Sequence, residues 1–169
     1  VPRREPGGAA RLERRVAQVL LDVTIDVDLD VSVPQIGART AGAAGLSGAG
    51  VKVAVLDTGI DASHPDLAGK VIAAANFTAD PPTDGNGHGT HVASTIAGTG
   101  AASGGRYTGV APGASLLSGK VCSNRGTCES SSIIAGMEWA TRQGADIVNM
   151  SLGGEPTDGT DPLSQALNT

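Results

Sequence analysis

Three short segments of this chain are almost continuously apolar, and they restrict the fold more than any other feature of the sequence. They cover residues 51–56, 115–121 and 145–152. A strand with one wet face alternates apolar and polar residues, whereas a strand buried on both faces is an unbroken apolar run. Such strands are typical of parallel sheets that are covered by helices. The three segments therefore predict strands of a parallel sheet.

The segment between the second and third runs has the pattern of a helix. Its apolar and small residues form one stripe at Ile133, Gly136, Met137 and Ala140. The serines at 130–132 offer an N-cap and Gly144 offers a stop, so we expect a helix over 130–143. Residues 161–167 look like the start of another helix. Strands that alternate with helices predict a doubly wound α/β fold with a mostly parallel sheet.

Residues 21–33 follow a different pattern. Apolar residues occupy every odd position from Leu21 to Val33, and polar residues occupy every even position. Strict alternation predicts a strand of an antiparallel sheet with one solvated face. A strand over the whole segment would be long, so we expect a break within it. We therefore assign this segment to a unit separate from the parallel sheet.

Charge and composition exclude several classes of function. The net charge is −5, whereas a nucleic-acid-binding protein would carry a basic patch. Aromatic residues make up 2% of the chain, which suits closely packed helices on a sheet better than an all-β sandwich or barrel. No apolar run reaches the ~18 residues that a membrane span needs. We therefore expect neither nucleic acid nor a membrane as a partner.

The two cysteines, Cys122 and Cys128, flank a polar turn that contains Gly126. Such a turn could bring the two sulfurs together, and a disulfide would imply an oxidising compartment. Two free thiols are the alternative. A possible disulfide between these residues is therefore one prediction of the sequence.

Several polar segments follow the predicted strands. Asp57 ends the first apolar run, and the glycine-containing stretch 151–154 ends the third. Ligands of an open parallel sheet bind at the carboxyl ends of its strands. A glycine-rich turn also delivers His88 to the start of a helix, and a histidine beside a carboxylate can exchange a proton near neutral pH. Asp57 and His88 are therefore candidate catalytic residues.

These residues also have plainer interpretations. An aspartate at the end of a strand is often a turn or capping residue. His88 and His91 could share a metal ion because they lie three residues apart, but no nearby glutamate completes a ligand set. We therefore predict no metal here, and we expect His91 to be a buried, hydrogen-bonded histidine.

Four motifs of the sequence resemble the subtilisin-like serine proteases, the subtilase family. In chain order they are VAVLDTGIDASHPDL, GNGHGTHVASTIAG, GVAPGASLL and IVNMSLGG. The resemblance runs from about residue 51 to the end of the chain. It implies a subtilisin-like fold and serine-type endopeptidase activity with an Asp-His-Ser triad, in the chain order of subtilisin.

The resemblance also implies a role for individual residues. Asp57 would orient the histidine, and His88 would be the general base and acid. Two triplets would form the walls of a peptide-binding groove: Gly126, Thr127 and Cys128 on one side, and Ser151, Leu152 and Gly153 on the other. Ile133 would help to line a pocket for a substrate side chain.

The family divides the chain into two parts. Residues 1–30 would be the C-terminal part of an inhibitory propeptide, and residues 31–169 would be the N-terminal half of the peptidase domain. The chain's own propeptide and a polypeptide substrate would then be partners. Because residues 31–121 look closest to secreted bacterial enzymes, we expect a secreted, extracellular protein made as a zymogen.

Two elements of the family pattern have no match in the 169 residues. They are the nucleophile motif Gly-Thr-Ser-Met-Ala and the asparagine of the oxyanion hole, which in the family lie downstream of NMSLGG. Ser151 and Ser164 are not substitutes, because neither has the motif context. We therefore expect a fragment that carries only the Asp and His, needs the missing C-terminal half as a partner, and is inactive alone.

The resemblance to the family leaves the question of calcium binding open. A structural calcium ion is common in the family, and the resemblance would place a ligand at Asp66. The loop between Gly98 and Gly109 has no Asn or Asp, so we make no calcium prediction. The implied chemistry needs no cofactor for catalysis.

Two other functions fit parts of the sequence. Asp-Thr-Gly also marks homodimeric aspartic proteases of the retroviral kind, but those are all-β proteins and their mechanism gives no role to GNGHGTH. A non-catalytic peptide-binding module or inactive fragment would keep the groove and lose the chemistry. A serine motif in the reading frame beyond residue 169 would decide between that alternative and a protease.

Overall fold

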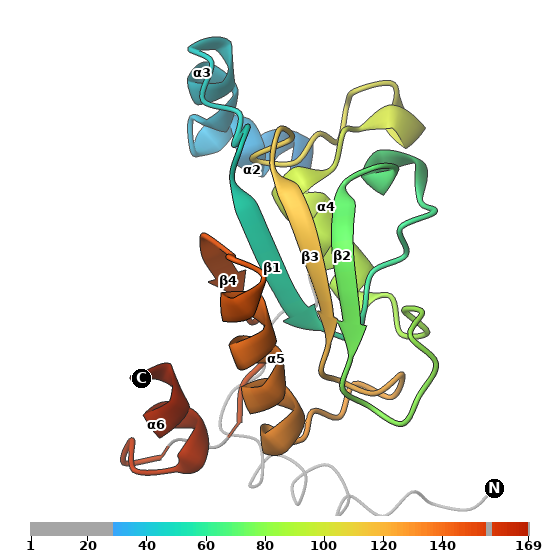
Figure 1. Ribbon diagram of the computed structural model, residues 1–169. Coiled ribbons are helices and arrows are strands. Elements are labelled where there is room, and N and C mark those ends of the chain that lie inside the picture. The colour runs from blue at the N-terminus through green and yellow to red at the C-terminus, as the bar shows by residue number, and fades with distance from the viewer. Residues whose placement is uncertain (1–28, 155–156, 169) are drawn as a thin grey trace, which may run out of the picture.

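A four-stranded parallel sheet forms the centre of the computed structural model, which describes residues 29–154 and 157–168 (Figure 1). The strands are β1 (Lys52–Asp57), β2 (Val71–Asn76), β3 (Ser115–Lys120) and β4 (Ile147–Asn149). They lie in the order β2-β3-β1-β4, and every pair is parallel. The prediction of an α/β fold with a mostly parallel sheet is confirmed.

β1 is the central strand and carries the motif that ends at Asp57. It pairs with β3 over its whole length, from Lys52 opposite Ser115 to Asp57 opposite Lys120. Val53 and the four residues after it are all buried, as a run without polar alternation predicts. The carboxyl ends of β1 and β3 therefore lie side by side.

Helices cover both faces of the sheet (Figure 1). α4 (His88–Ala97) packs on one face and α5 (Ser130–Arg142) on the other. Side chains alternate along β1, so that Val55 joins the core cluster toward α4 and Leu56 joins the cluster toward α5. The face of α4 toward the sheet is lined by small residues, because Gly89, Ala93 and Ala97 are all buried.

α5 confirms the predicted helix, with one correction at its start. Its buried residues Ile133, Gly136 and Ala140 belong to the predicted stripe, and Gly144 follows the helix in a left-handed conformation. The predicted serine N-cap is wrong, because Glu129 holds the cap position and makes no side-chain capping bond. The hydroxyl of Ser132 instead donates to the carbonyl oxygen of Phe77.

The two edge strands differ from expectation. β4 is only three residues long, although the apolar run extends over 145–152. β2 has no counterpart among the predicted strands, because half of its sequence VIAAAN is alanine, which has a low strand preference. It forms an edge strand all the same, through pairing with β3.

The predicted strand over 21–33 is wrong in its described part. Residues 29–33 belong to helix α2 (Leu29–Gln35), which is followed by α3 (Ala38–Ala43), and residues 21–28 lie outside the described residues. A helix places Leu29 and Val33 on one face, and Val33 is buried. Tertiary contact thus overrides the alternating pattern, and Arg106 Nε donates to Asp30 Oδ2 at 2.7 Å.

Three short helices complete the described structure: η1 (Pro65–Leu67), η2 (Ala101–Ser103) and α6 (Pro162–Leu167). The predicted helix start at Asp161 is confirmed, because its carboxylate accepts from the backbone N–H groups of Leu163 and Ser164. Within the part of the chain that the structure describes, no helix is long and apolar enough to cross a membrane.

Candidate active site

Asp57 is held at the carboxyl end of β1. It is the last residue of the strand and is only 2% exposed. Its Oδ1 accepts a hydrogen bond from the backbone N–H of Thr58 at 2.7 Å. A buried carboxylate needs such donors, since desolvation of an unpaired charge is costly. The strand end therefore fixes both the place and the orientation of this carboxylate.

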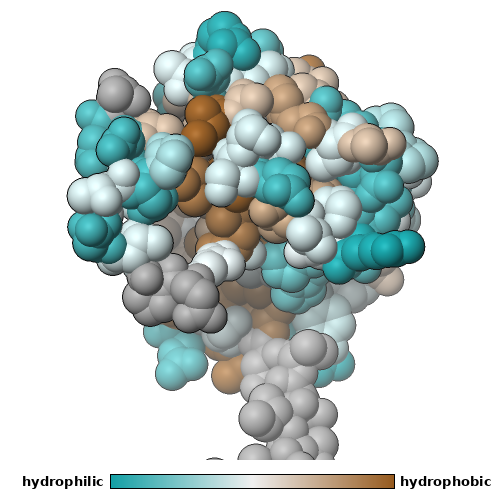
Figure 2. All heavy atoms as spheres, turned by 90° about the horizontal axis from the view of Figure 1, so that it is seen from below, coloured by the Kyte–Doolittle hydropathy of each residue, from teal (hydrophilic) through white to brown (hydrophobic). Residues whose placement is uncertain are grey.

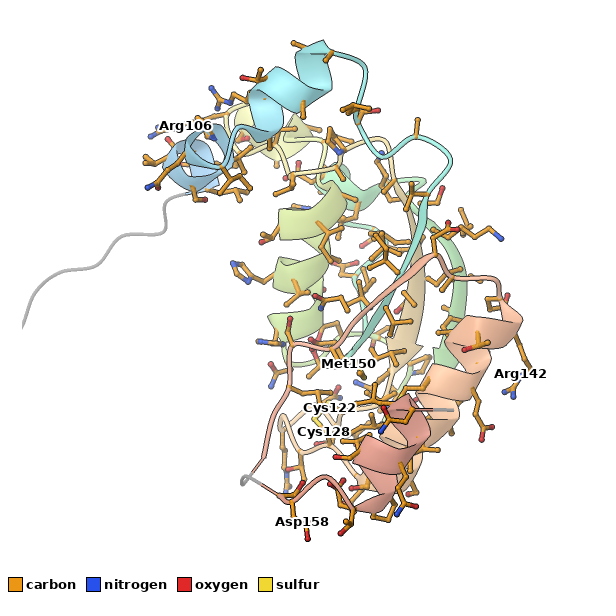
Figure 3. All side chains as sticks on the ribbon, turned by 90° about the vertical axis from the view of Figure 1, so that its left-hand side faces the viewer. Arg106, Cys122, Cys128, Arg142, Met150 and Asp158 are labelled. Atoms are coloured by element: carbon orange, nitrogen blue, oxygen red, sulfur yellow. A yellow bond between two sulfur atoms is a disulfide. The ribbon has the colours of Figure 1, made fainter. Side chains whose placement is uncertain are left out.

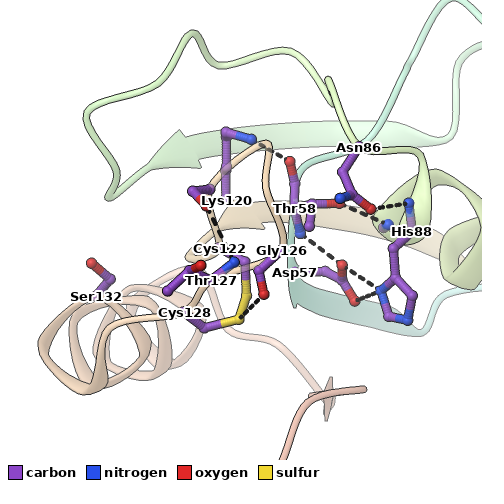
Figure 4. Close-up of a disulfide and its surroundings, with 12 residues drawn as sticks. Asp57, Thr58, Asn86, His88, Lys120, Cys122, Gly126, Thr127, Cys128 and Ser132 are labelled. Atoms are coloured by element: carbon purple, nitrogen blue, oxygen red, sulfur yellow. Dashed lines mark hydrogen bonds and ion pairs between the residues drawn. A yellow bond between two sulfur atoms is a disulfide. The ribbon is translucent and has the colours of Figure 1, made fainter.

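His88 pairs with Asp57 across the gap between α4 and β1 (Figure 4). Its Nδ1 lies 2.8 Å from Asp57 Oδ1 and 3.0 Å from Oδ2. Ionised carboxylate oxygens only accept, so these contacts assign the proton to Nδ1 and leave Nε2 as the acceptor of a neutral ring. The imidazole is 49% exposed, against 3% for the Asp57 side chain. A base with an oriented ring thus faces solvent.

Gly89 allows the helix to approach the strand this closely. A Cβ atom on Gly89 would lie 2.1 Å from the carbonyl oxygen of Gly59 and 3.2 Å from Asp57 Cβ. Its backbone N–H donates to Thr58 Oγ1 at 3.0 Å. A side chain at this position would push α4, and His88 with it, away from β1.

Asp84, which the sequence did not point out, organises the turn before His88. Its Oδ1 accepts from Thr58 Oγ1 at 2.9 Å and from the N–H of Gly87 at 2.8 Å. Its Oδ2 accepts from the N–H of Thr90 at 2.9 Å and from Thr90 Oγ1 at 2.5 Å. An acidic residue just before a helix is a signal of capping that could have identified it. One carboxylate thus ties the helix start to the turn after β1.

The hydrogen bonds also set the charge state of Asp84. Burial acts to raise the pKa of its carboxyl, but hydrogen bonds from Thr90, Gly87 and Thr58 outweigh burial and lower that pKa to about 2. Asp84 is therefore ionised throughout the neutral range. Its negative charge near the N-terminus of α4 also interacts favourably with the helix dipole.

A disulfide closes the loop that follows β3. Cys122 and Cys128 are bonded, and their backbones form an isolated antiparallel bridge (Figure 4). Cys122 is buried, and Met150, which follows β4, packs in the same apolar cluster (Figure 3). The loop between the cysteines is therefore pinned against the sheet at both of its ends.

Most of the predicted groove residues surround one hollow together with the Asp57–His88 pair. This hollow has a volume of about 240 Å³. From the two predicted walls, it is lined by Gly126, Cys128, Ser151, Leu152 and Gly153. Thr127, which joins Gly126 to Cys128, does not line this hollow but a separate one with Ser123 and Ser132. The structure thus brings both walls, except Thr127, next to His88.

A larger apolar hollow adjoins the first. It has a volume of about 380 Å³ and contains Ile133. Its other apolar lining residues are Cys128, Met150, Leu152, Leu163 and Leu167. The view onto the carboxyl ends of the strands shows hydrophobic residues in a recessed band between hydrophilic margins (Figure 2). An apolar side chain could be accommodated a short distance from His88.

The remaining sequence candidates lie away from this pair. The expectation that His91 is buried is wrong, since it lies on an exposed face of α4. His64 caps η1, where its Nδ1 accepts from the N–H of Asp66. Asp66 is buried, and its Oδ1 accepts from the N–H of Ala102 at 2.7 Å. Among the described residues, no group of three or more His, Cys, Asp and Glu could hold a metal ion.

Comparison with known proteins gives consistent matches. A family model described as the Subtilase family matches residues 48–169. Subtilisin DY of Bacillus licheniformis is 47% identical over 138 residues, which is 80% of this chain and 48% of that protein. Subtilisin E of Bacillus subtilis (strain 168) is 47% identical over 131 residues, or 76% of this chain and 33% of that protein. The major intracellular serine protease of the same strain is 44% identical over 153 residues, which is 86% of this chain and 47% of that protein.

The comparisons also show how much of each relative's length this chain covers. The chain spans about half, or less, of the length of the curated relatives it matches. The described hollow, the Asp57–His88 pair and all four strands fall within the matched region.

Proposed function

The chain belongs to the subtilase family of serine proteases, and from that premise we propose that it supplies the Asp and His of an Asp-His-Ser triad in a serine endopeptidase. The observation that supports this most directly is the bond between buried Asp57 and half-exposed His88. In the proposed mechanism Nε2 of His88 takes the proton of a serine hydroxyl and later returns it to the leaving amine. Asp57 holds the ring in the required tautomer and stabilises its positive charge.

The serine nucleophile and the asparagine of the oxyanion hole would come from a segment beyond these 169 residues. No serine among the described residues is a hydrogen-bond partner of His88, whose side chain bonds only to Asp57. The known relatives are also about twice as long as the matched region or longer. We therefore propose that residues 1–169 alone do not hydrolyse peptides. The proposed reaction uses side chains and backbone groups without a cofactor.

The polypeptide substrate would bind as an extended strand between the two groove walls. Gly126, Ser151 and Gly153 are exposed beside His88. Gly153 and Gly154 are exposed, and a Cβ on either would meet nothing within 4 Å, so the space beside this segment could take an added strand. The adjoining apolar hollow with Ile133 would take an apolar substrate side chain.

The rest of the domain would pack on the flank beyond β4. Two apolar hollows meet this strand, one beside Val148 and one beside Ile147. Exposed apolar surface on both sides of an edge strand favours association with further structure. We propose that the C-terminal half of the peptidase domain covers it.

We further propose that residues 1–30 end an inhibitory propeptide and that the protein is secreted. The proposed propeptide lies almost entirely outside the described residues. The Cys122–Cys128 disulfide supports an oxidising compartment, because such bonds are rare in the reducing cytosol.

Labelling with a fluorophosphonate, which reacts with an activated serine, tests the proposed triad. Two proteins are compared: residues 1–169 alone, and residues 1–169 continued after Thr169 by the second half of Subtilisin DY. We expect labelling and peptide hydrolysis only in the continued protein. His88→Ala should abolish both, while His91→Ala, a control on the same helix, should leave both intact.

The other outcomes separate the alternatives. Hydrolysis by residues 1–169 alone that disappears in His88→Ala would contradict the proposed need for a second half. Labelling of the continued protein that survives His88→Ala would contradict the role of His88. If the protein binds a peptide and neither form is labelled, the non-catalytic binding module is the better description.

A further inference from the structure

Lys120, the last residue of β3, is a buried cation that the proposed mechanism does not use. It is 1% exposed. In the described part of the chain, its Nζ has two hydrogen-bond acceptors: Thr58 O at 2.5 Å, which Figure 4 shows, and Asn124 Oδ1 at 2.8 Å. Both are neutral oxygens. Burial of an ammonium without a carboxylate is unfavourable unless its hydrogen bonds are well made, so both oxygens are strongly held.

The first acceptor belongs to the turn that carries the catalytic aspartate. Thr58 follows Asp57 directly, and its N–H donates to Asp57 Oδ1. Its hydroxyl donates to Asp84 and accepts from the N–H of Gly89. Lys120 also stands opposite Asp57 in the register of the two strands. The bond to the Thr58 carbonyl therefore fixes the peptide unit between Asp57 and the start of α4.

The second acceptor belongs to the disulfide loop. Asn124 lies between Cys122 and Cys128, and its Oδ1 also accepts from the N–H of Gly85 at 3.2 Å. Its carbonyl oxygen accepts from Asn86 Nδ2 at 3.1 Å. Gly85 and Asn86 form the turn before His88. Asn124 thus joins the loop that carries one groove wall to the turn that delivers the histidine.

We propose that Lys120 is a positioning residue that couples the disulfide loop to the Asp57–His88 pair. Through one ammonium group it holds the Thr58 carbonyl on one side and the Asn124 amide on the other. The groove wall at Gly126 and the imidazole of His88 then keep a fixed relative position. The proposal rests on the proposed roles of Asp57 and His88, but its geometry does not depend on peptidase activity.

The test measures the Asp57–His88 bond by NMR in residues 1–169 labelled with ¹⁵N-histidine and ¹⁵N-glycine. The Nδ1 proton signal of His88 is assigned by its absence in His88→Ala. In Lys120→Met, which keeps the length of the side chain and removes the charge, we expect this proton to exchange with water about tenfold faster or more, as after loss of a charged hydrogen bond. The amide signals of Gly85 and Gly126 should shift in the same variant.

Lys52→Met is the matched control. Lys52 Nζ also donates to a carbonyl oxygen, that of Gln143 at 3.2 Å, but it lies at the opposite end of β1. This variant should leave the His88 proton and both glycine signals unchanged. Unchanged signals in this control would show that replacing a lysine by methionine does not in itself disturb the Asp57–His88 pair.

Two outcomes would overturn the proposal. In the first, folded Lys120→Met shows unchanged exchange and unchanged glycine signals. In the second, it is less stable to urea with the same unchanged signals, so that Lys120 is only a structural residue. If Lys120→Met does not fold, Asn124→Ala decides, because it removes one acceptor and keeps the lysine. That variant must shift the Gly85 signal and speed exchange at His88, and unchanged signals there overturn the proposal too. Because the readout is the proton itself, failure of the triad proposal in the labelling test would be seen separately.

Discussion

β1 has a different environment on each of its two sides. Toward β3 it pairs along all six residues, and the turn after it is bonded to Asp84, Gly89 and Lys120. Toward β4 it pairs at only three residues, and Ile147 and Val148 of that strand remain 54% and 40% exposed. We call these the closed side and the open side of β1.

The two sides of β1 bear on different parts of the candidate site: the orientation of the Asp57–His88 pair and the completion of the proposed groove. On the closed side, the Asp57–His88 pair is oriented by contacts that all lie within the described residues. On the open side, apolar side chains are exposed, and the proposed groove wall at Ser151–Gly153 follows directly from the short strand. Orientation of the pair is therefore a property of this chain, whereas completion of the proposed groove would depend on what packs beyond β4.

The largest effect is expected from a substitution that removes the carboxylate of Asp57 on the closed side. In the protein continued through the second half, Asp57→Asn should lower kcat by about 10⁴, which is the size of the loss already known for the triad aspartate of subtilisin itself. An amide can donate to the ring and so favour the wrong tautomer. Asp146→Asn is the control, because Asp146 accepts from the N–H of Lys52 beside β4 and lies at the other end of the sheet. Equal losses in the two variants would contradict the special role of Asp57.

A smaller effect is expected from added volume. Gly89→Ala should destabilise residues 1–169 by about 3 kcal/mol or more, because the new Cβ would overlap the Gly59 carbonyl oxygen. Gly154→Ala, where an added Cβ meets nothing within 4 Å, should stay within about 0.5 kcal/mol. Urea unfolding measures both. A well-tolerated Gly89→Ala would show that α4 can move away from β1 at little cost.

The sequence predicted the parts of this comparison that depend on local patterns. The apolar runs of β1 and β3, the stripe of α5 and the placement of His88 at a helix start all follow from residues close together in the chain. β2 was missed because alanine carries little strand preference, and α2 was mistaken for a strand because alternation does not report tertiary contact.

The bonds around the pair were beyond sequence reasoning for a different reason. Thr58 and Asp84 lie 26 positions apart, and Lys120 and Thr58 lie 62 apart. Which hydroxyl or carbonyl meets which side chain depends on strand register and on the course of two loops. An aspartate in a glycine-rich turn or a lysine at the end of an apolar run looks like an ordinary exposed residue until the fold is known.

A third prediction concerns the closed side and the pH dependence of the stability that Asp84 contributes there. The folded pKa of Asp84, about 2, lies below the ordinary aspartate value of about 4. Its hydrogen bonds therefore add stability that is fully present above about pH 4 and is lost as the pH falls toward about 2. Asp84→Asn should cost about 1 kcal/mol at pH 7, reduced by solvent screening, and the cost should vanish at the acid end.

The matched control is Asp158→Asn, in the exposed turn before α6. Hydrogen bonds from Thr160 also lower the pKa of Asp158, but this carboxylate lies at the surface and caps no helix. Because solvent screens this exposed carboxylate, urea unfolding from pH 7 down to about 2 should show a much smaller pH-dependent cost for Asp158→Asn than for Asp84→Asn. A pH-independent cost in Asp84→Asn would mean that packing, and not charge, is what Asp84 contributes.

The smallest expected effect tests the open side. Ile147 of β4 and Ile72 of β2 are both 54% exposed, and they lie on the two opposite edges of the sheet. In residues 1–169, replacing either by threonine should change the free energy of unfolding by no more than about 0.5 kcal/mol, because little apolar surface is buried there. Threonine keeps the β-branched shape, so strand preference changes little.

In the protein continued through the second half, the two substitutions should separate. If the added half covers β4, Ile147 becomes buried, and Ile147→Thr should then cost about 1–2 kcal/mol, the transfer free energy of the lost apolar contact and the buried hydroxyl. Ile72→Thr should still cost no more than about 0.5 kcal/mol. Equal effects at both edges would place the added half away from β4. In that case the open side of β1 would need another cover, and the groove wall that follows β4 would not be completed by this association.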